Sequence, residues 1–584
     1  MKFYQKCAEY WQNKYEIISR RFVIFSKSQA LLFISLIISL AIYPNVWIFL
    51  ALFLSWLVLT VIKAMIKRKL QKLQSIISVY RDDAARINVD WANIHSSNKG
   101  SYYTISTNHA FAHDLEIIGD YSLHTLLDRC ETKQGSEYLL KHLLSCASNA
   151  KNKVQHDLIR EVETYRRFRT RIRISGKKIN NDISFSLNSS LLKPSFASLN
   201  MLYAVYILGW AMSIIGILWG TYMPSIFFII LYCLFFGFTF NLKTLRIVRE
   251  LENTWRSFLS INKFCCREYD KASPTLKEHL NIICNSKTGI EQYKKQLTLL
   301  LLFSGLQSNL LLALFFNFLG PLNAWLETKV SILVNQIKEH SPKWIEAWAH
   351  LEAMSCLAHL SERTLFNHAQ IIASPNLELV DFGHPLIPDN ADVQNSINIG
   401  DTNNIVLITG ANMSGKSTLL RAVSMNMVLA LSGARVKAKF FTLPESNIIT
   451  CISPRDSLTD GSSRFHAEVA RIKKITNCWE DNNKFSIFFI DEIFSSTNNE
   501  ERAIATLSFI KKSAQHRTIG FITTHDSNVL KGSLEMRHVS PYHMKSSIVE
   551  NTLHFDYRLH EGGGLDRNAL HILYEEGVID NVNP

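Results

Sequence analysis

The sequence predicts an α/β domain at the C-terminus, preceded by an all-α region that carries two hairpins of apolar helices. Three observations support this fold class: a glycine-rich loop between a strand-like and a helix-like segment near residue 410, two long stretches without charge, and a composition that is 47% hydrophobic and only 19% charged. Soluble chains contain about 25% charged residues. At about 150 residues per domain, the 584 residues predict three or four structural units.

The charge balance and the cysteines narrow the possible partners. The chain has 63 Lys and Arg against 50 Asp and Glu, a formal charge of +13, which favours an anionic partner such as nucleic acid or a membrane leaflet. The 10 cysteines form no Cys-x-x-Cys pair and no zinc-like spacing with histidine, which argues against a metal site or a disulfide scaffold. A reducing, cytosolic setting fits, and Cys265-Cys266 is interpreted as a pair of core thiols.

Residues 1–28 are predicted to be a cytoplasmic N-terminal segment and residues 29–66 a first transmembrane hairpin. The stretch from Ser28 to Ile62 has no charge and is interrupted by Pro44-Asn45. Each half is about 17 residues long, just enough to span about 30 Å of hydrocarbon. Basic residues flank the stretch, so the positive-inside rule predicts that its turn faces away from the cytoplasm. A cleaved signal is disfavoured because a second apolar half follows at once.

Residues 197–240 are predicted to form a second transmembrane hairpin. The surrounding stretch, 194–242, is uncharged, and its centre at 220–224 has the composition of a turn. The two hairpins predict a multi-pass protein of the inner (plasma) membrane with its soluble parts in the cytoplasm. A third apolar run, 296–326, contains four Asn or Gln residues. We interpret it as a buried helix, with a fifth span as the alternative, because an odd number of spans would place the C-terminal domain and its glycine-rich loop outside the cytoplasm.

A phosphate-binding loop is predicted at residues 409–418. The apolar run Ile405–Ile408 precedes the sequence TGANMSGKST, and a helix-like run follows it. In this pattern Gly410 and Gly415 allow backbone amides at a helix N-terminus to hold phosphates. Lys416 is expected to reach the β- and γ-phosphates, and Ser417 to bind Mg²⁺. The other loop residues expected to contact ATP are Ala411, Asn412, Met413, Ser414 and Thr418.

Two further strand ends are predicted to complete this site. The run 487–490 ends in Asp491-Glu492, where Asp491 is expected to bind the Mg²⁺ shell and Glu492 to orient or deprotonate the attacking water. The run 519–522 leads to His525, which is expected to sense the γ-phosphate. Acidic residues that follow a strand are often only solvated, and a histidine in such a place often has a structural role. The glycine-rich loop about 75 residues upstream of Asp491 favours the catalytic interpretation instead. It implies ATP and Mg²⁺ as cofactors and hydrolysis of ATP to ADP and phosphate as the reaction.

These motifs together resemble the MutS family of DNA mismatch-recognition ATPases, whose ATPase domain belongs to the ABC class. The loop shares the family's Asn412-Met413 pair, and residues 456–469 resemble its signature stretch. The segment after the second strand departs from the family, since Phe494-Ser495-Ser496 replaces its usual Gly-Arg-Gly. The resemblance implies that Ser463 reaches the nucleotide bound by the other subunit. The active form is therefore expected to be a homodimer with composite sites.

The resemblance also divides the rest of the chain. It implies a MutS-like helical lever region in two parts, 105–196 and 241–375, which follows a linker at 67–104. The ABC ATPase domain is expected at 376–584, and Gly383-His384-Pro385 matches the stretch that opens this domain in the family. The first 100 residues are too few for the family's mismatch-reading domain and contain no Phe-x-Glu motif. The sequence thus predicts a family member that lacks mismatch recognition of the usual kind.

A basic run in the lever region is a candidate contact for a polyanion. It contains no acidic residue and consists of Arg166, Arg167, Arg169, Arg171 and Arg173, followed by two lysines. Such a run can neutralise DNA phosphates or anionic lipid head groups. A solvated face next to a membrane segment is an equally good interpretation.

The function predicted from these features is that of a membrane-anchored MutS-like ATPase. By resemblance, its ATP cycle is coupled to binding of mismatched or branched DNA. The alternative is an ATP-driven membrane or protein-assembly machine without DNA recognition. The expected partners are a second copy of the chain, the membrane, DNA, and other repair or membrane proteins.

Overall fold

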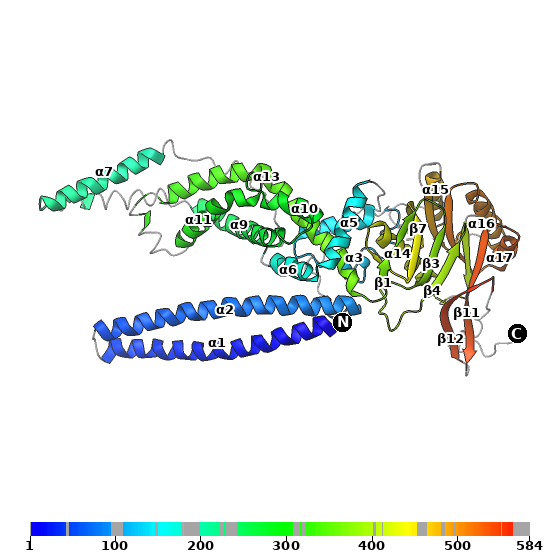
Figure 1. Ribbon diagram of the computed structural model, residues 1–584, viewed down its shortest axis with the longest axis horizontal. Coiled ribbons are helices and arrows are strands. Elements are labelled where there is room, and N and C mark those ends of the chain that lie inside the picture. The colour runs from blue at the N-terminus through cyan, green and yellow to red at the C-terminus, as the bar shows by residue number, and fades with distance from the viewer. Residues whose placement is uncertain are drawn as a thin grey trace. The chain divides into compact units, whose positions relative to one another are not determined.

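The chain forms two compact units in the computed structural model (Figure 1). The sheet unit comprises Met1–Asp128, Leu139–Thr164 and Met354–Pro584, and the helical unit comprises Arg129–Tyr138 and Tyr165–Ala353. The structure describes residues 2–42, 46–94, 109–145, 150–177, 179, 199–221, 223–224, 226–227, 242–307, 316–317, 320, 322–400, 404–411, 413–452, 464–479, 485–494, 498–549 and 552–564.

A six-stranded sheet with the order β12-β11-β5-β10-β9-β8 forms the centre of the sheet unit. Five of its strands are parallel and β12 is antiparallel to β11. The strands are β5 (Ile405–Gly410), β8 (Ser446–Cys451), β9 (Phe485–Asp491), β10 (Thr518–Thr524), β11 (Val539–Val549) and β12 (Thr552–Glu561). The strands predicted at 405–408, 487–490 and 519–522 are confirmed as β5, β9 and β10. Their nearly continuous burial is expected for parallel strands covered on both faces.

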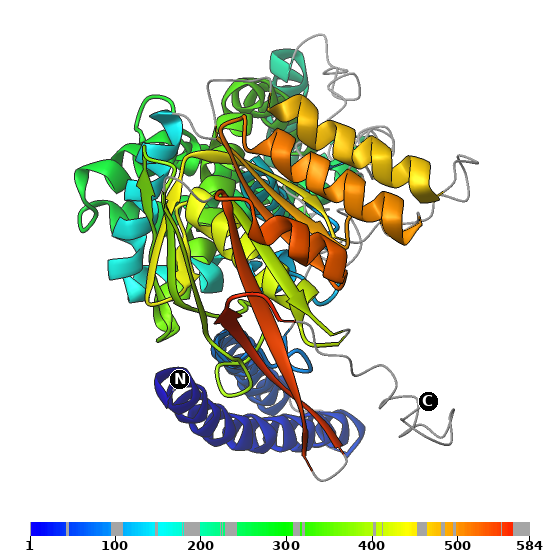
Figure 2. The ribbon, with the colours of Figure 1, turned by 90° about the vertical axis from the view of Figure 1, so that its right-hand side faces the viewer.

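Helices cover both faces of this sheet. On one face lie α15 (Arg464–Cys478), α16 (Asn499–Ser513) and α17 (Ser527–Leu534), drawn in yellow-orange to dark orange in Figure 2. Their core contains a cluster of three rings, in which the centroid of Trp479 lies 5.8 Å from that of Phe488 and 5.3 Å from that of Phe509. The buried residues of α14 (Lys416–Leu431) are not part of this core, although α14 packs against β5, β9 and β10. We infer that α14 covers the opposite face.

Two smaller sheets lie beside α14. A four-stranded sheet has the order β2-β7-β3-β4, and a short sheet pairs β1 with β6. Their bounds are β1 (Phe366–His368), β2 (Gln370–Ile372), β3 (Leu377–Phe382), β4 (Asn395–Ile399), β6 (Arg435–Lys437) and β7 (Phe440–Pro444), preceded by the 3₁₀ turn η2 (His359–Glu362). Asn395 joins β4 to β12, since its side chain donates to Tyr557 O (3.1 Å) and accepts from Leu559 N (2.7 Å). This pairing holds Tyr557 near the start of α14.

The N-terminal part of the sheet unit is a long helical hairpin. It consists of α1 (Lys2–Ile42) and α2 (Val46–Asn88), which lie side by side in both views. Both helices continue through the boundaries expected at residues 28 and 67, and the division into a segment at 1–28 and a linker from residue 67 stays a prediction. Burial explains the continuation of α2: Leu73, Ile76 and Ile77 are buried at helical spacing. Near its end, Arg86 Nη1 donates to the carbonyls of Thr125 (2.6 Å) and Leu126 in α3 (Leu123–Leu127).

The predicted transmembrane topology is corrected by the structure. Within the described part of the chain, no helix combines the length and the apolar character that a bilayer crossing requires. The uncharged part of α1 runs from Ser28 to Ile42, about 22 Å at 1.5 Å per residue, which is shorter than a hydrocarbon core of about 30 Å. The predicted multi-pass plasma-membrane localisation is therefore wrong, and the two predicted transmembrane hairpins are not supported. Of the second predicted hairpin, α7 (Leu199–Leu218) forms the first half, and 228–241 lie outside the described residues.

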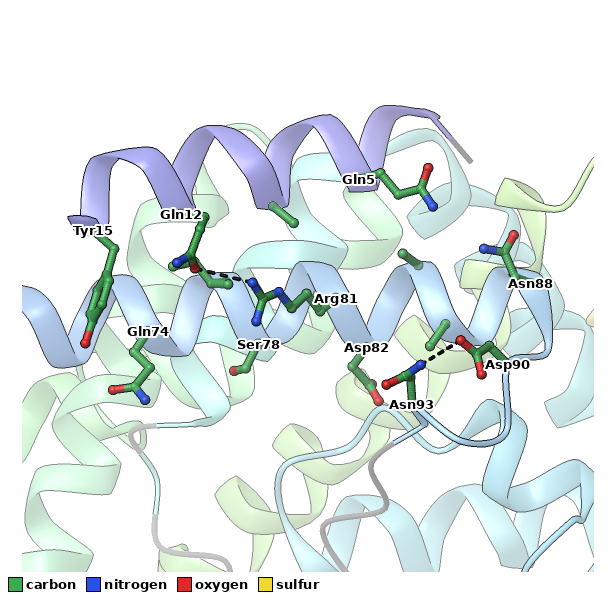
Figure 3. Close-up of a pocket in the computed structure, with 14 residues that line it drawn as sticks. Gln5, Gln12, Tyr15, Gln74, Ser78, Arg81, Asp82, Asn88, Asp90 and Asn93 are labelled. Atoms are coloured by element: carbon green, nitrogen blue, oxygen red, sulfur yellow. Dashed lines mark hydrogen bonds between the residues drawn. The ribbon is translucent and has the colours of Figure 1, made fainter. Parts of the chain in front are cut away.

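A polar pocket of about 570 Å³ lies between α1 and α2 (Figure 3). Its labelled side chains come from both helices and from the segment that follows α2. Arg81 Nη2 donates to Gln12 Oε1 across the pocket (3.4 Å), and Asn93 Nδ2 donates to Asp90 Oδ2 (2.8 Å). The residues that line it belong to neither the glycine loop nor the strand ends.

The helical unit has an aromatic core and accounts for most of the predicted lever region. Trp255, Phe258, Trp344 and Trp348 are almost completely buried in it. Its helices are α6 (Arg166–Gly176), α7, α9 (Leu242–Tyr269), α10 (Pro274–Cys284), α11 (Ile290–Gln307) and most of α13 (Leu322–Ala358), while α4 (Lys133–Ser145) contributes to both units and α5 (Ala150–Thr164) to the sheet unit. The run 296–326 begins inside α11, where Leu297 and Leu300 are buried, and residues 308–315 of that run lie outside the described part.

The basic run of the lever region is only partly a surface feature. Arg169 is 1% exposed, and Arg173 Nε donates to Glu131 Oε1 (3.0 Å) inside the helical unit. Arg171 pairs with Glu268 at 2.9 Å. The prediction that all five arginines face a polyanion is therefore wrong for Arg169 and Arg173, because α6 turns this side of the run towards its own core.

Candidate nucleotide-binding site

The glycine-rich loop joins β5 to α14 in a conformation that requires both predicted glycines. Gly410 has φ +150° and Gly415 has φ +98°, and both values disfavour L-residues. A Cβ atom on Gly410 would lie 2.9 Å from the carbonyl oxygen of Met544. Helix α14 begins directly after Gly415, so its first N–H groups lie beside the loop without intrahelical partners. Such a helix start favours the binding of an anion.

Lys416 folds back across the loop. Its Nζ donates to the backbone carbonyls of Gly410 (2.9 Å) and Ala411 (2.8 Å). Burial lowers the pKa of Lys416, and the nearby carboxylates of Glu492 and Asp491 oppose this shift. A buried ammonium whose partners are mainly neutral carbonyls is suited to exchange them for phosphate oxygens. Of the other predicted loop residues, Met413, Ser414 and Thr418 lie in the described loop and the start of α14, and Asn412 lies outside the described residues.

Asp491 connects the three elements that meet at the loop. Ser417 Oγ on α14 donates to Asp491 Oδ2 (2.5 Å), and Thr523 Oγ1 on β10 donates to Asp491 Oδ1 (2.5 Å). Thr523 in turn accepts a hydrogen bond from Glu492 N (3.1 Å). Magnesium in phosphate sites is typically held by one or two carboxylates, substrate phosphates and water. The contact between Ser417 and Asp491 fits such an ion, and nowhere in the described chain do three His, Cys, Asp or Glu residues form a metal site by themselves.

Glu492 and His525 form a pair at the open side of the site. His525 Nδ1 lies 3.1 Å from Glu492 Oε1, and both side chains are partly exposed. The hydrogen bond from His525 lowers the pKa of Glu492; burial opposes the shift, and the charges of Lys416 and Arg502 add to it. Glu492 is therefore ionised at neutral pH and can accept a proton from water.

The backbone around the site is strained in several places. Four non-glycine residues near the loop have left-handed conformations: Met413 (φ 69°), Glu492 (φ 52°), Phe494 (φ 56°) and Tyr557 (φ 55°). Such conformations cost about 1–3 kcal/mol each and are concentrated at functional sites. This concentration favours a functional role for the loop, the end of β9 and the middle of β12.

A second pocket opens beside the loop, at the first turn of α14. Its volume is about 310 Å³, and it is lined by Val393, Gly415, Leu419, Met544 and Tyr557 among others. A pocket of this size with mainly apolar walls is typical for a small organic group. This pocket could not be found from the sequence, because its walls come from four separate segments. Tyr557 lies in the strand β12 and is exposed.

Residues 114–116, which precede α3, contact both α14 and α15. Arg421, one turn into α14, donates from Nη1 to Glu116 Oε1 (2.8 Å) and from Nε to Asp114 O (3.1 Å). The Asp114 carboxylate accepts from Thr450 Oγ1 at the end of β8 (3.0 Å) and pairs with Arg471 of α15 (3.4 Å). The segment thus ties the loop helix to the helix that follows Ser463. Ser463 itself lies outside the described residues.

Two histidines hold the other end of α14. His142 Nε2 lies 3.0 Å from Ser432 O, and His156 Nε2 lies 3.3 Å from Leu431 O. Burial lowers the pKa of both histidines, which keeps each imidazole neutral, with one N–H free to donate. Helix α14 is therefore contacted by α4 and α5 at its C-terminus, as well as by residues 114–116 near its start. Motion of the loop helix would be transmitted to these segments.

The strand, glycine loop and helix, with Asp491-Glu492 at the end of the strand two positions away in the sheet, define a P-loop nucleotide-binding domain of the ATPase type. Residues 406–579 match the family model described as MutS domain V. The C-terminal part of the chain therefore belongs to the MutS family.

Individual relatives agree with this assignment. The chain is 28% identical over 252 residues to the DNA mismatch repair protein MutS of Bacillus pumilus, which covers 41% of this chain and 29% of that protein. It is 31% identical over 214 residues to the MutS protein of Fusobacterium nucleatum (35% and 24% covered) and 26% identical over 270 residues to that of Staphylococcus aureus (44% and 30% covered). The matched region is thus less than a third of the length of these relatives.

Proposed function

We propose that this chain binds and hydrolyses ATP and uses the cycle to switch a homodimer that acts on DNA. The observation that supports hydrolysis best is the convergence of Lys416, Ser417, Asp491, Glu492 and His525 at the carboxyl ends of β5, β9 and β10. Ligands of open α/β sheets bind at this edge.

The loop and the adjoining pocket suggest how ATP is oriented. The backbone of residues 410–418 and the Lys416 ammonium would hold the phosphates. The base would enter the pocket of about 310 Å³, where the ring of Tyr557 is available for stacking. Mg²⁺, when bound with ATP, would be held by Ser417 and Asp491 and would neutralise charge on the phosphates.

Glu492 is the proposed general base. As a carboxylate it would orient a water for in-line attack on the γ-phosphorus and accept its proton. The proposed role of His525 is to report whether the γ-phosphate is present, because it contacts Glu492 directly. Loss of the phosphate would change this contact. The adjoining α17 starts with Asp526 as its N-cap and would be affected at once.

Ser463 is proposed to complete the site of the other subunit. It directly precedes α15, whose position is fixed by the pair between Arg471 and Asp114. In a composite site, each nucleotide would contact the loop of one chain and Ser463 of the partner. Opening of the dimer after hydrolysis would then be transmitted through α14 to α4 and α5.

Replacing Tyr557 with alanine is expected to weaken ATP binding about 5- to 30-fold, since loss of ring stacking and of the apolar wall costs about 1–2 kcal/mol. The rate of hydrolysis at saturating ATP should change little. Titration with a fluorescent ATP analogue measures the affinity. Tyr557→Phe is the matched control, because it keeps the ring, and it should bind as the wild type does. Equal affinities for all three proteins would show that the base lies elsewhere.

Coupling to DNA is proposed because the relatives are DNA mismatch repair proteins and because this chain has a formal charge of +13. The ATPase rate of the full chain is measured alone and with homoduplex, mismatched or four-way-junction DNA at two salt concentrations. We expect stimulation that depends on the DNA structure and weakens at higher salt, because released counterions contribute to binding. Absence of both binding and stimulation at low salt would contradict the coupling and favour a protein partner.

A further inference from the structure

The segment Gly383-His384-Pro385 contributes to the wall of the pocket beside Tyr557. It matches the stretch that opens the family's ATPase domain, but neither the phosphate loop nor the Mg²⁺ ligands proposed above account for it. Gly383 and His384 line the pocket of about 310 Å³ together with Leu419 and Tyr557. His384 is buried, with an exposed fraction of 6%. A polar side chain in the wall of a mainly apolar pocket is suited to fix the orientation of a ligand.

The backbone of His384 is held by a buried ion pair. Its N–H donates to Asp392 Oδ2 (3.1 Å), and its carbonyl accepts from Lys437 Nζ (3.3 Å). Lys437 also pairs with Asp392 at 2.9 Å, and both side chains are almost completely buried. A Cβ atom on Gly383 would collide with the Asp392 carboxylate, so this close approach requires glycine. The position of the imidazole is therefore set without a ligand.

A hydrogen bond to the imidazole defines which of its nitrogens carries the proton. Leu386 N donates to His384 Nδ1 (3.2 Å), so Nδ1 is an acceptor and has no proton. Burial lowers the pKa of His384 to about 4, and the charges of Lys437 and Arg421 add to the shift. The ring is therefore neutral at physiological pH, and its one proton lies on Nε2.

The Nε2–H group is available to a ligand. In the part of the chain that the structure describes, Nε2 has no hydrogen-bond partner, and it is not completely enclosed by protein atoms. Because His384 is otherwise buried and lines the pocket, we infer that Nε2 faces the pocket. A ligand that displaces water from the pocket would bury this donor. Such burial costs free energy unless the ligand supplies an acceptor.

Other polar side chains in the wall of the pocket are already engaged. Asn395 uses both ends of its amide on the backbone of β12. Asp392 is paired with Lys437. Thr418 belongs to the loop at 409–418, which is expected to hold the phosphates. These engagements leave His384 as a donor for the base.

We propose that His384 Nε2 donates a hydrogen bond to a ring nitrogen of adenine and thereby orients the base in the pocket beside Tyr557. This inference rests on the proposed binding of ATP and names the side chain that recognises its base. Adenine in ATP has three ring nitrogens that can accept, N1, N3 and N7. Stacking on Tyr557 tolerates any base, because every base has a π face. A donor in a fixed position instead favours a base whose acceptor lies opposite it.

The test uses the full chain with ATP and its 1-deaza, 3-deaza and 7-deaza analogues, each of which has C–H in place of one acceptor nitrogen. Competition with a ribose-labelled fluorescent ATP analogue gives each affinity. We expect one deaza analogue to bind the wild type about 5-fold more weakly than ATP, which is the effect of one neutral hydrogen bond. Equal affinities for ATP and all three analogues would overturn the proposal.

The variant His384→Asn separates the Nε2 donor from the other contacts of the ring. Its amide lies near the position of Nδ1 and can still accept from Leu386 N, but it does not reach the position of Nε2. This variant should bind ATP about 5-fold more weakly than the wild type and should no longer distinguish ATP from the weaker analogue. His384→Gln has a longer side chain that can place an N–H near the position of Nε2. It should recover part of the affinity and of the discrimination.

Two outcomes for the variants and the wild type contradict the proposal in different ways. Discrimination against the same analogue that persists in His384→Asn would show that another group contacts that nitrogen. A wild type that fails to bind ATP would contradict the proposed ATPase activity together with this inference, whereas ATP binding without any difference among the analogues would overturn the role of His384 alone. Thermal unfolding without nucleotide checks that each variant is folded, and the comparison of analogues on the wild type requires no variant.

Discussion

Replacing Glu492 with glutamine is expected to abolish ATP turnover and to leave ATP binding intact. Glutamine has nearly the same shape and can still accept the hydrogen bond from His525 through its amide oxygen. It cannot accept a proton from water. Because general base catalysis contributes about 10²- to 10⁴-fold to a rate, the single-turnover rate of hydrolysis should fall by that factor. The affinity for ATP should stay within about twofold, since no phosphate-binding group is removed.

The matched control is Glu500→Gln, the same chemical change at an exposed position in the first turn of α16. It should hydrolyse ATP at the wild-type rate. Rapid-quench measurement of bound ATP gives the rate of the chemical step, and the fluorescent analogue gives the affinity. Unchanged turnover in Glu492→Gln would refute its role as the base. Loss of ATP binding in that variant would mean that the carboxylate acts in binding instead.

Replacing Lys416 with alanine is expected to weaken ATP binding at least about 30-fold. The ammonium lies within the loop, and its carbonyl partners are released when phosphate oxygens replace them. Truncating one partner of a buried charge pair costs about 2–5 kcal/mol, which is equivalent to about 30- to several-thousand-fold in affinity. Lys439→Ala is the control, because this lysine is 76% exposed at the surface of the same unit. Its affinity for ATP should equal that of the wild type.

Unfolding of the Lys416→Ala variant would also abolish ATP binding and has to be distinguished from loss of the charge. Lys416 also stabilises the empty loop, so the thermal unfolding of the variant is compared with that of Lys416→Met, which keeps most of the apolar stem. Both variants should unfold near the wild-type temperature and fail to bind ATP. Wild-type affinity in either one would show that the phosphates are held elsewhere.

The Lys416 variant also tests the composite dimer. Alone, Lys416→Ala and Ser463→Ala should both be inactive. In a mixed dimer, one of the two sites combines the intact loop of the second chain with the intact Ser463 of the first. An equal mixture should therefore recover about a quarter of the wild-type rate, since half of the dimers are mixed and each has one complete site. No recovery after subunit exchange would mean that Ser463 does not act across a dimer interface.

The loop and the two strand ends were predictable because each is encoded in a short segment. Gly410, Gly415 and Lys416 are placed by the turn between β5 and α14, and Asp491-Glu492 by the end of a continuous apolar run. Parallel strands bring their carboxyl ends to one edge of the sheet, so residues that follow different strands meet there without further information. The sequence also indicated the helical hairpin around Pro44-Asn45, although not its length.

Other features depended on contacts between distant segments, which periodicity and composition do not encode. An uncharged run looks the same whether it crosses a bilayer or forms part of a longer helix, and an arginine run looks the same whether it faces solvent or, as at Arg169 and Arg173, its own core. The pocket beside Tyr557 needs four segments, and the clamp of Asp114 on Arg471 joins residues more than 350 positions apart. The sequence by itself determined the chemistry at the strand ends, since local backbone geometry positions those groups. Only tertiary packing decided which side chains line the pocket beside Tyr557 and which segments contact the two ends of α14, because these depend on how separate elements bury their faces against one another.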